Sequence, residues 1–166
     1  MSRGVESLVG VVAPEVLLDA IETSQKLTHL GVPHVLIGGL AVGLHGHPRA
    51  TKDVDFLVGP EAFERTSPFL IYREELKDIA RVGVIDLMAV PAAFPYLSEF
   101  LAVPQDDAIP LLSVEALVML KLDAGRAQDL ADVLALIAAG AQPDNLIAYL
   151  RQHAAHLITR LTAILE

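Results

Sequence analysis

Two aspartates one residue apart are the feature of this sequence best suited to chemistry. Asp53 and Asp55 begin the run Asp-Val-Asp-Phe-Leu-Val, whose last three residues are apolar and typical of a buried strand. On a strand, residues i and i+2 project to the same face, so the two carboxylates would lie side by side. Burying carboxylates without partners is costly, so stability does not explain the pair, whereas a bound cation would. Alternatively, both acids are solvated at the end of the strand, or Asp53 caps a turn.

A pair of glycines precedes these acids. Gly38-Gly39 follows the apolar run 35–37, and thirteen residues separate Gly39 from Asp53. A strand that ends in Gly-Gly before a helical segment leaves backbone N–H groups free, and such groups suit a phosphate. The alternative is that small residues are needed there for close packing of helix and strand.

A third acid, Asp86, interrupts another apolar run, 84–88. On a neighbouring strand it would complete, with Asp53 and Asp55, a set of oxygen ligands for two Mg²⁺ ions. The alternative is a buried acid that is paired with a lysine or arginine. A phosphate cradle together with metal-binding acids indicates metal-assisted phosphate chemistry.

Cationic and hydroxyl side chains are available to contact phosphate oxygens. Three of them come just before the first acid, and two lie on helices predicted later in the chain: Arg49, Thr51, Lys52, Lys121 and Arg126. The alternative is that they form ion pairs with nearby acids, and for Lys52 a solvated side chain. Asp129 lies three residues after Arg126, so it either forms a helix-surface pair or orients Arg126 or Lys121.

Composition limits the classes of protein that fit. The chain has 166 residues, enough for one domain with its own core, and a net charge of −9 that argues against duplex DNA as a partner. The absence of cysteine excludes disulfides and thiolate metal sites. No apolar run reaches the ~18 residues of a membrane span. Glu6 would interrupt a signal peptide, so we expect a cytoplasmic protein. The 53% hydrophobic content leaves a homo-oligomer or a partner protein open.

The elements that position these residues follow from periodicity and from glycine and proline. Helices are predicted at 14–30, 39–44, 114–122, 126–139 and 143 to the C-terminus, and strands at 34–37, 53–58, 69–72 and 81–88. This order predicts an α+β fold, a small mixed sheet flanked by helices with a helical C-terminal extension. We expect residues 1–112 to form the core with its N-terminal helix, and residues 113–166 to pack on it within one domain.

Together these residues resemble the nucleotidyltransferase superfamily typified by DNA polymerase β. Its pattern is an apolar residue, Gly-Gly or Gly-Ser, a spacer, two aspartates that alternate with apolar residues, and a later carboxylate on an adjacent strand. Ile37-Gly38-Gly39, Asp53-Val54-Asp55-Phe56 and Asp86 match it position by position. The chain is also similar to small bacterial and archaeal nucleotidyltransferase-like proteins, which include toxins of abortive-infection-type toxin–antitoxin pairs. Residues 113–132, which include Lys121, Arg126, Asp129 and Asp132, resemble the helical segment of those proteins.

The resemblance implies a role for each matched residue. Asp53 and Asp55 would hold two Mg²⁺ ions, or Mn²⁺ in their place, that bridge the phosphates of an NTP. Asp86 would share one ion and help to activate the acceptor hydroxyl, while Gly38 and Gly39 would donate backbone N–H groups to the β- and γ-phosphates. The implied activity is Mg-dependent transfer of a nucleoside monophosphate to RNA, to a protein or to a small molecule such as an aminoglycoside. A cognate antitoxin is a candidate partner.

Two other interpretations compete with this one. The short stretch 59–81 and the lack of a separate acceptor-binding domain favour a catalytically silent module that binds a nucleotide or a partner. The intact set of three acids argues against it. A purely structural, oligomeric helical protein leaves the two same-face acids and Asp86 unexplained.

Overall fold

The computed structural model describes residues 4–66, 68–81 and 83–166. Seven α-helices and three strands account for most of the regular structure in these ranges: α1 Pro14–His29, β1 His34–Ile37, α2 Gly38–Leu44, β2 Val54–Val58, α3 Lys77–Arg81, β3 Ile85–Ala89, α4 Val114–Ala124, α5 Ala127–Ala138, α6 Pro143–His153 and α7 Ile158–Leu165. Five short 3₁₀ helices lie between or before them: η1 Val5–Leu8, η2 Pro60–Ala62, η3 Glu74–Leu76, η4 Pro95–Phe100 and η5 Ala155–Leu157. The order agrees with the predicted α+β class.

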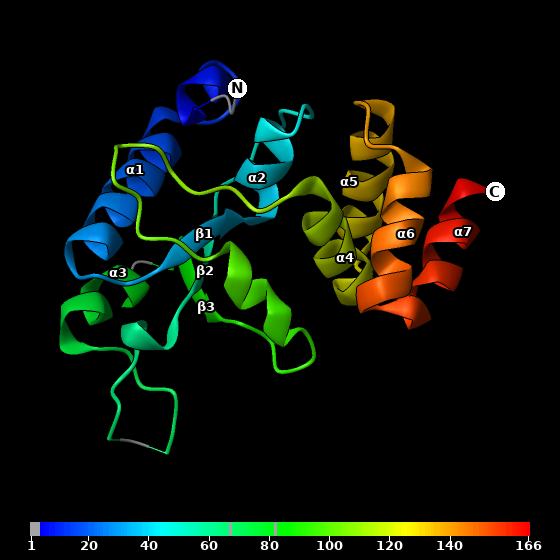
Figure 1. Ribbon diagram of the computed structural model, residues 1–166. Coiled ribbons are helices and arrows are strands. Elements are labelled where there is room, and N and C mark those ends of the chain that lie inside the picture. Colours follow the sequence, from blue (N-terminus) through cyan, green and yellow to red (C-terminus); the bar gives the residue numbers. More distant parts are fainter. Residues whose placement is uncertain (1–3, 67, 82) are drawn as a thin grey trace.

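The sheet has the strand order β1-β2-β3, with β1 antiparallel and β3 parallel to β2 (Figure 1). Ile37 is paired with Asp55, and Asp55 with Asp86. Because paired residues on adjacent strands project to the same face, these three side chains share one face of the sheet. The register therefore places two of the three predicted acids side by side.

The opposite face of the sheet packs against α1. His34 and Phe56 lie on this face, in edge-to-face contact with ring centroids 5.5 Å apart. His34 Nε2 accepts a hydrogen bond from the Ser24 hydroxyl of α1 at 2.8 Å, and His34 Nδ1–H donates to the Val32 carbonyl at 2.8 Å. Burial lowers the pKa of His34, although the bond to Val32 acts in the other direction. A neutral imidazole thus fastens α1 to the start of β1.

The outer edge of β1 is covered by the segment that leads to α4. The His34 and Leu36 backbones form hydrogen bonds with Ala102, Pro110 and Leu112. The Ser113 hydroxyl then caps α4 by accepting the Ala116 N–H at 3.3 Å. Covering the edge removes a row of free backbone groups that would otherwise invite another strand.

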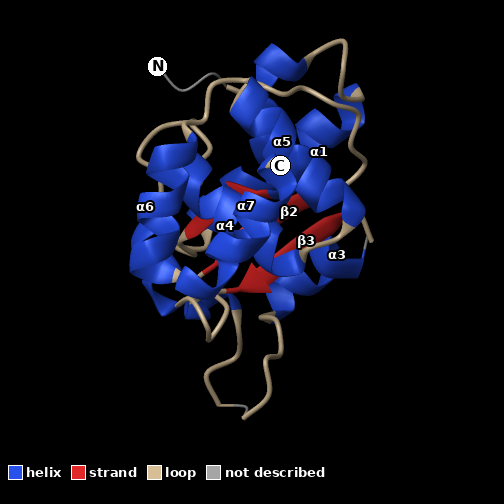
Figure 2. Ribbon diagram, turned by 90° about the vertical axis from the view of Figure 1, so that its right-hand side faces the viewer, coloured by secondary structure: helices blue, strands red, loops and turns tan. Residues whose placement is uncertain are grey.

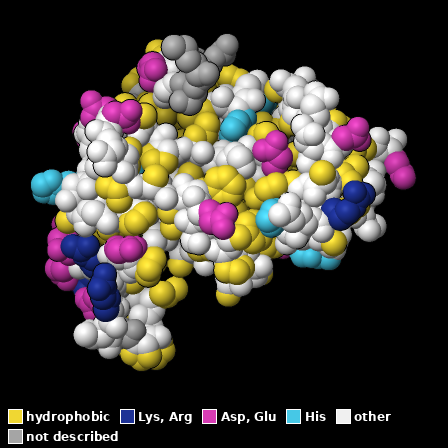
Figure 3. Space-filling view, in the orientation of Figure 1, with side chains coloured by type: hydrophobic (Ala, Val, Ile, Leu, Met, Phe, Trp, Pro, Cys, Tyr) yellow, Lys and Arg dark blue, Asp and Glu magenta, His cyan; other side chains and the backbone are white. Residues whose placement is uncertain are grey.

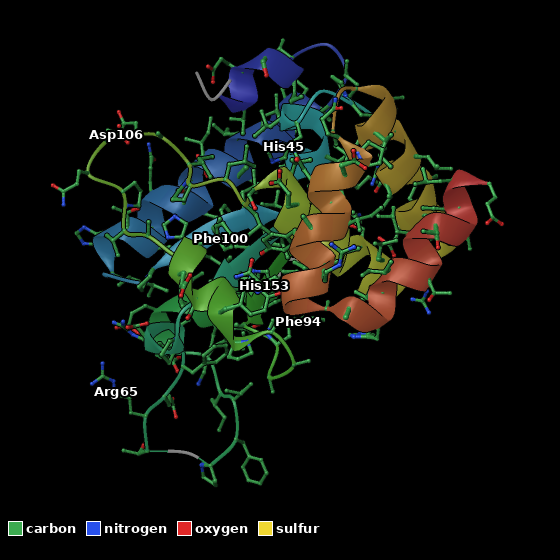
Figure 4. The ribbon with its side chains drawn as sticks, turned by 45° about the vertical axis from the view of Figure 1, so that its right-hand side comes forward. His45, Arg65, Phe94, Phe100, Asp106 and His153 are labelled. Atoms are coloured by element: carbon green, nitrogen blue, oxygen red, sulfur yellow. The ribbon has the colours of Figure 1, made fainter. Side chains whose placement is uncertain are left out.

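The C-terminal helices α4 to α7 stand beside the sheet, and in the view of Figure 2 they lie in front of the strands. Gly125, in the left-handed conformation at φ 65°, ends α4 and lets α5 turn back along it. A stack of aromatic rings holds α6 to η4, since the His153 and Tyr96 centroids are 4.1 Å apart. The Phe94 ring also packs on Tyr96, edge to face, and Figure 4 labels both Phe94 and His153.

The structure differs from the predicted elements at three places. Lys77–Arg81 forms α3, and β3 begins only at Ile85, so the strand predicted at 81–88 is wrong at its start; Val82 lies outside the described residues. Residues 69–72 form no strand, and only Tyr72 makes an isolated bridge, with Phe63. The final predicted helix is split, because Ala154 leaves helical geometry at φ −157° and ψ 58°. In the part of the chain that the structure describes, no helix is long and apolar enough to cross a membrane.

The buried imidazole predicts a pH-dependent stability. Below about pH 6.5 an unfolded histidine takes up a proton that folded His34 resists, so its contribution to the free energy of unfolding falls as the pH falls. We expect the free energy of unfolding of wild type, relative to that of His34→Gln, to fall between about pH 7.5 and 5, measured by urea denaturation. The control is His156→Gln, the same replacement at an exposed position. A wild-type-like slope in His34→Gln would contradict this account.

Candidate active site

A cleft of about 510 Å³ lies between the sheet face that carries the acids and the helices α4 and α5. The sheet side contributes all three predicted acids, Asp53, Asp55 and Asp86. Asp55 is half-buried, whereas Asp53 and Asp86 are exposed. Asp53 comes directly before the first residue of β2, so it lies at the mouth of the strand as the solvated alternative required. The cleft therefore has an acidic floor that is accessible to solvent.

Gly38 is required by the acid that it faces. Its φ of +71° suits glycine, and a Cβ at this position would lie 2.1 Å from Asp55 Oδ2. Both observations make a side chain at Gly38 unfavourable, because it would strain the backbone and displace the Asp55 carboxylate. The glycine therefore makes room for the Asp55 carboxylate at the point where β1 passes into α2.

The neighbouring acids affect the pKa of Asp55. Burial, in the first place, and the charges of Asp86 and Asp53 together raise the pKa of Asp55 to about 6. Lys121 and Arg126 act in the opposite direction. In the described parts of the chain Asp55 has no hydrogen-bond or ion-pair partner that would neutralise its charge. The fold thus holds a carboxylate in a place where its charge is unfavourable.

The wall opposite the acids carries three cations. Arg49 comes from the loop before β2, Lys121 from the last turn of α4, and Arg126 from the turn into α5; all three line the cleft. On the face shown in Figure 3, Lys and Arg side chains gather in small groups that lie far apart, with no broad basic surface between them.

Two buried carboxylates hold these cations in place. Asp132 receives Arg49 Nε and Nη2 at 2.8 and 2.9 Å and lies 2.9 Å from Lys121 Nζ. Asp129 receives Lys121 Nζ at 3.0 Å and Arg126 Nε at 2.6 Å. Burial alone would raise the pKa values of both carboxyl groups, but the hydrogen bonds from these cations outweigh it and hold both pKa values below the usual range. The cluster of three cations and two carboxylates has one net positive charge.

The structure brings together nine of the ten residues predicted for the site. Lys52 is exposed and does not line the cleft, in agreement with the solvated alternative. Thr51 lines it, with Oγ1 packed against Gly39. Arg49, Lys121 and Arg126 form the ion pairs that were the alternative to phosphate contact, and they do so while facing the cleft.

Sequence reasoning missed the role of Asp132 and the contribution of Asp123 and Gln128 to the cleft lining. Asp132 lies three residues after Asp129, so both project from the same face of α5. That spacing was the available signal. Its partner Arg49 is 83 residues away in the sequence, and no local sequence pattern predicts a pair so far apart.

The donors fit a divalent cation in chemistry but are not assembled into a finished cage. Carboxylate oxygens are the ligands that Mg²⁺ prefers, and the raised pKa of Asp55 shows a charge that a cation would relieve. Among the described residues, however, no three His, Asp or Glu side chains are grouped closely enough to hold a metal. Because Asp53 and Asp86 are exposed, side-chain rotation is open to both.

Comparison with known proteins supports the fold. No family model and no curated protein matches the sequence. Among solved structures, the chain is similar to an antigenic nucleotidyltransferase-like protein from Paracoccidioides brasiliensis, with a TM-score of 0.51 and 18% sequence identity over 93% of this chain and 94% of that chain. The predicted nucleotidyltransferase fold is therefore confirmed over nearly the whole chain, its helical C-terminal part included.

Because Gly38 lies against Asp55, the methyl group of an alanine at this position should lower the free energy of unfolding. Gly38→Ala should lower the free energy of unfolding by at least about 1 kcal/mol more than Gly83→Ala, because it also displaces a carboxylate. Gly83 is the matched control, since its φ of +72° is the same but no atom lies within 4 Å of the added Cβ. Equal losses in the two variants, measured by urea denaturation, would show that Asp55 does not occupy this space.

The raised pKa of Asp55 predicts that this acid destabilises the native state. Its folded pKa of about 6 lies above the ordinary value of 3.8, so folding takes up a proton at Asp55 between these pH values, and the contribution of Asp55 to the free energy of unfolding rises as the pH falls through 6. At about pH 7.5, without divalent cations, Asp55→Asn should be more stable than wild type by roughly 1–3 kcal/mol. This advantage should shrink toward pH 4. A variant that is less stable at neutral pH would contradict the assignment.

Proposed function

We propose that this protein transfers a nucleoside monophosphate from an NTP to a hydroxyl acceptor with the help of Mg²⁺. The observation that carries the proposal is the pairing of Asp55 with Asp86 on neighbouring strands, across a cleft from Arg49, Lys121 and Arg126. An acidic floor that suits cations and a cationic wall that suits phosphates are both needed to hold a metal-bound triphosphate. The fold similarity agrees with this activity.

The residues have distinct tasks in this reaction. Asp53, Asp55 and Asp86 would hold the Mg²⁺ ions, which supply charge neutralisation at the triphosphate when bound. Arg49, Lys121 and Arg126 would contact phosphate oxygens. The acceptor oxygen forms a bond to the α-phosphorus while the bond from that phosphorus to the bridging oxygen breaks, and pyrophosphate leaves. Asp86, which is exposed on the edge strand, would accept the hydroxyl proton.

A second candidate is a nucleotide-binding module that does not turn over. It is favoured by the lack, in the described residues, of three acids grouped as a metal site, and by cations that are already paired with Asp129 and Asp132. The acceptor would be RNA, a protein or a small molecule. The partner would be a cognate antitoxin or a second copy of the chain. Both proposals depend on the cleft being active.

The proposal is tested by titrating the protein with each of the four NTPs in the presence and absence of Mg²⁺, using calorimetry. We expect Mg-dependent binding that falls by at least about tenfold in Asp53→Asn and in Asp55→Asn, because each loses a charged ligand. The control, Asp107→Asn, makes the same change on an exposed loop and should bind as wild type does.

Turnover separates the two candidates. Incubation with α-labelled NTP and a mixture of RNA, protein and small-molecule acceptors should give a labelled product in wild type and none in Asp86→Asn. Binding without any product would favour the silent module. If no NTP binds, with or without Mg²⁺, both candidates are overturned.

A further inference from the structure

We propose, on the premise that the cleft binds a triphosphate, that buried Asp132 is a positioning residue, which sets triphosphate affinity by holding Arg49 and Lys121 on the cleft wall. Asp132 has no exposed surface and does not line the cleft, so it cannot touch a nucleotide itself. Its two cationic partners both line the cleft. Any effect of Asp132 on binding must therefore pass through them.

The hydrogen-bond capacity of Asp132 is fully used within the protein. Its two oxygens receive Arg49 Nε and Nη2, Lys121 Nζ and Gln128 Nε2, all within 3.0 Å. A carboxylate offers about four acceptor positions, and four donors occupy them. Asp132 is thus satisfied as a fixed anchor and has no lone pair left for a ligand.

The two cations, in contrast, keep donors for a ligand. The Arg49 guanidinium has five N–H bonds, of which two are given to Asp132 and one to the Ala50 carbonyl at 3.3 Å. Lys121 has three, of which Asp129 and Asp132 take one each. Two donors on Arg49 and one on Lys121 are left to contact phosphate oxygens. Held by Asp132, these donors have a fixed direction before the phosphate arrives.

Gly39 places the Arg49 guanidinium beside the start of α2. A Cβ at Gly39 would lie 3.2 Å from Arg49 Nη2 and 2.9 Å from Thr51 Oγ1. The guanidinium therefore spans from the glycine pair to α5, where Asp132 lies. This is the reason that an anchor on α5 can control a donor next to Gly38-Gly39.

The test uses calorimetric titrations with two probes. One is inorganic tripolyphosphate with Mg²⁺, which carries no nucleobase, and the other is the NTP that binds best. We expect Asp132→Asn to fold, and to bind both probes about 10- to 100-fold more weakly, because the side chain keeps its size and loses its charge. Asp107→Asn is the matched control. A double-mutant cycle with Arg49→Ala should be non-additive, with Asp132→Asn costing little once Arg49 is absent.

A purely structural role for Asp132 gives a different result. It would lower the melting temperature of Asp132→Asn while the folded protein kept wild-type affinity, and the cycle would then be additive; that result overturns the positioning role and leaves the proposed function intact. If wild type binds neither probe, the proposed function and this inference fail together.

A measurement on wild type covers the case in which Asp132→Asn does not fold. The NMR resonance of the Arg49 Nε–H group reports on the bond to Asp132 directly. We expect it to exchange slowly with solvent and to shift on addition of Mg-tripolyphosphate. Rapid exchange, or no shift at saturation, would show that Asp132 does not hold Arg49 for the phosphate.

Discussion

Repulsion between carboxylates on neighbouring strands is the constraint on which the rest of the site depends. The register of β2 and β3 puts Asp55 beside Asp86, and burial adds to the cost of charge on Asp55. A core assembled for stability alone would place an apolar residue at such a position. Since the positions of β2 and β3 on the opposite face, toward α1, are apolar, the acids are a local departure from the pattern that stabilises the sheet.

The surrounding structure makes room for the Asp55 carboxylate but, among the described residues, does not neutralise its charge with an ion pair. Gly38 leaves space for the Asp55 carboxylate, and the turn at Gly125 folds α5 back along α4 so that cations face the acids. Those cations are paired with Asp129 and Asp132 and not with Asp55. The positive and negative halves of the site are consequently kept apart across the cleft, and a ligand that carries both metal ions and phosphates would complete each half.

The sequence predicted the acidic half of the site and much of the fold, because those features are local. Same-face spacing of Asp53 and Asp55, the glycine pair and the apolar runs all act within a few residues, and the strands 34–37 and 53–58 followed from them. The start of β3 was predicted too early, because 77–81 has enough helical character to form α3. The anchor role of Asp132 was out of reach, since it depends on tertiary contacts with Arg49, 83 residues away, and with Lys121 on the preceding helix.

The separation of the two halves also bears on which function the cleft can have. If the exposed acids bound no ligand, nothing would require a buried carboxylate, Asp132, that holds cations opposite them. Asp132 is costly to bury and is stabilised only by its four donors, so removing its charge leaves Arg49 and Lys121 without a common partner. Because the anchor lies on α5 and the acids lie on β2 and β3, the helical C-terminal part is an integral component of the site. An isolated sheet core would keep Asp53, Asp55 and Asp86 but lose two of the three cations that face them, Lys121 and Arg126, together with the anchor of Arg49.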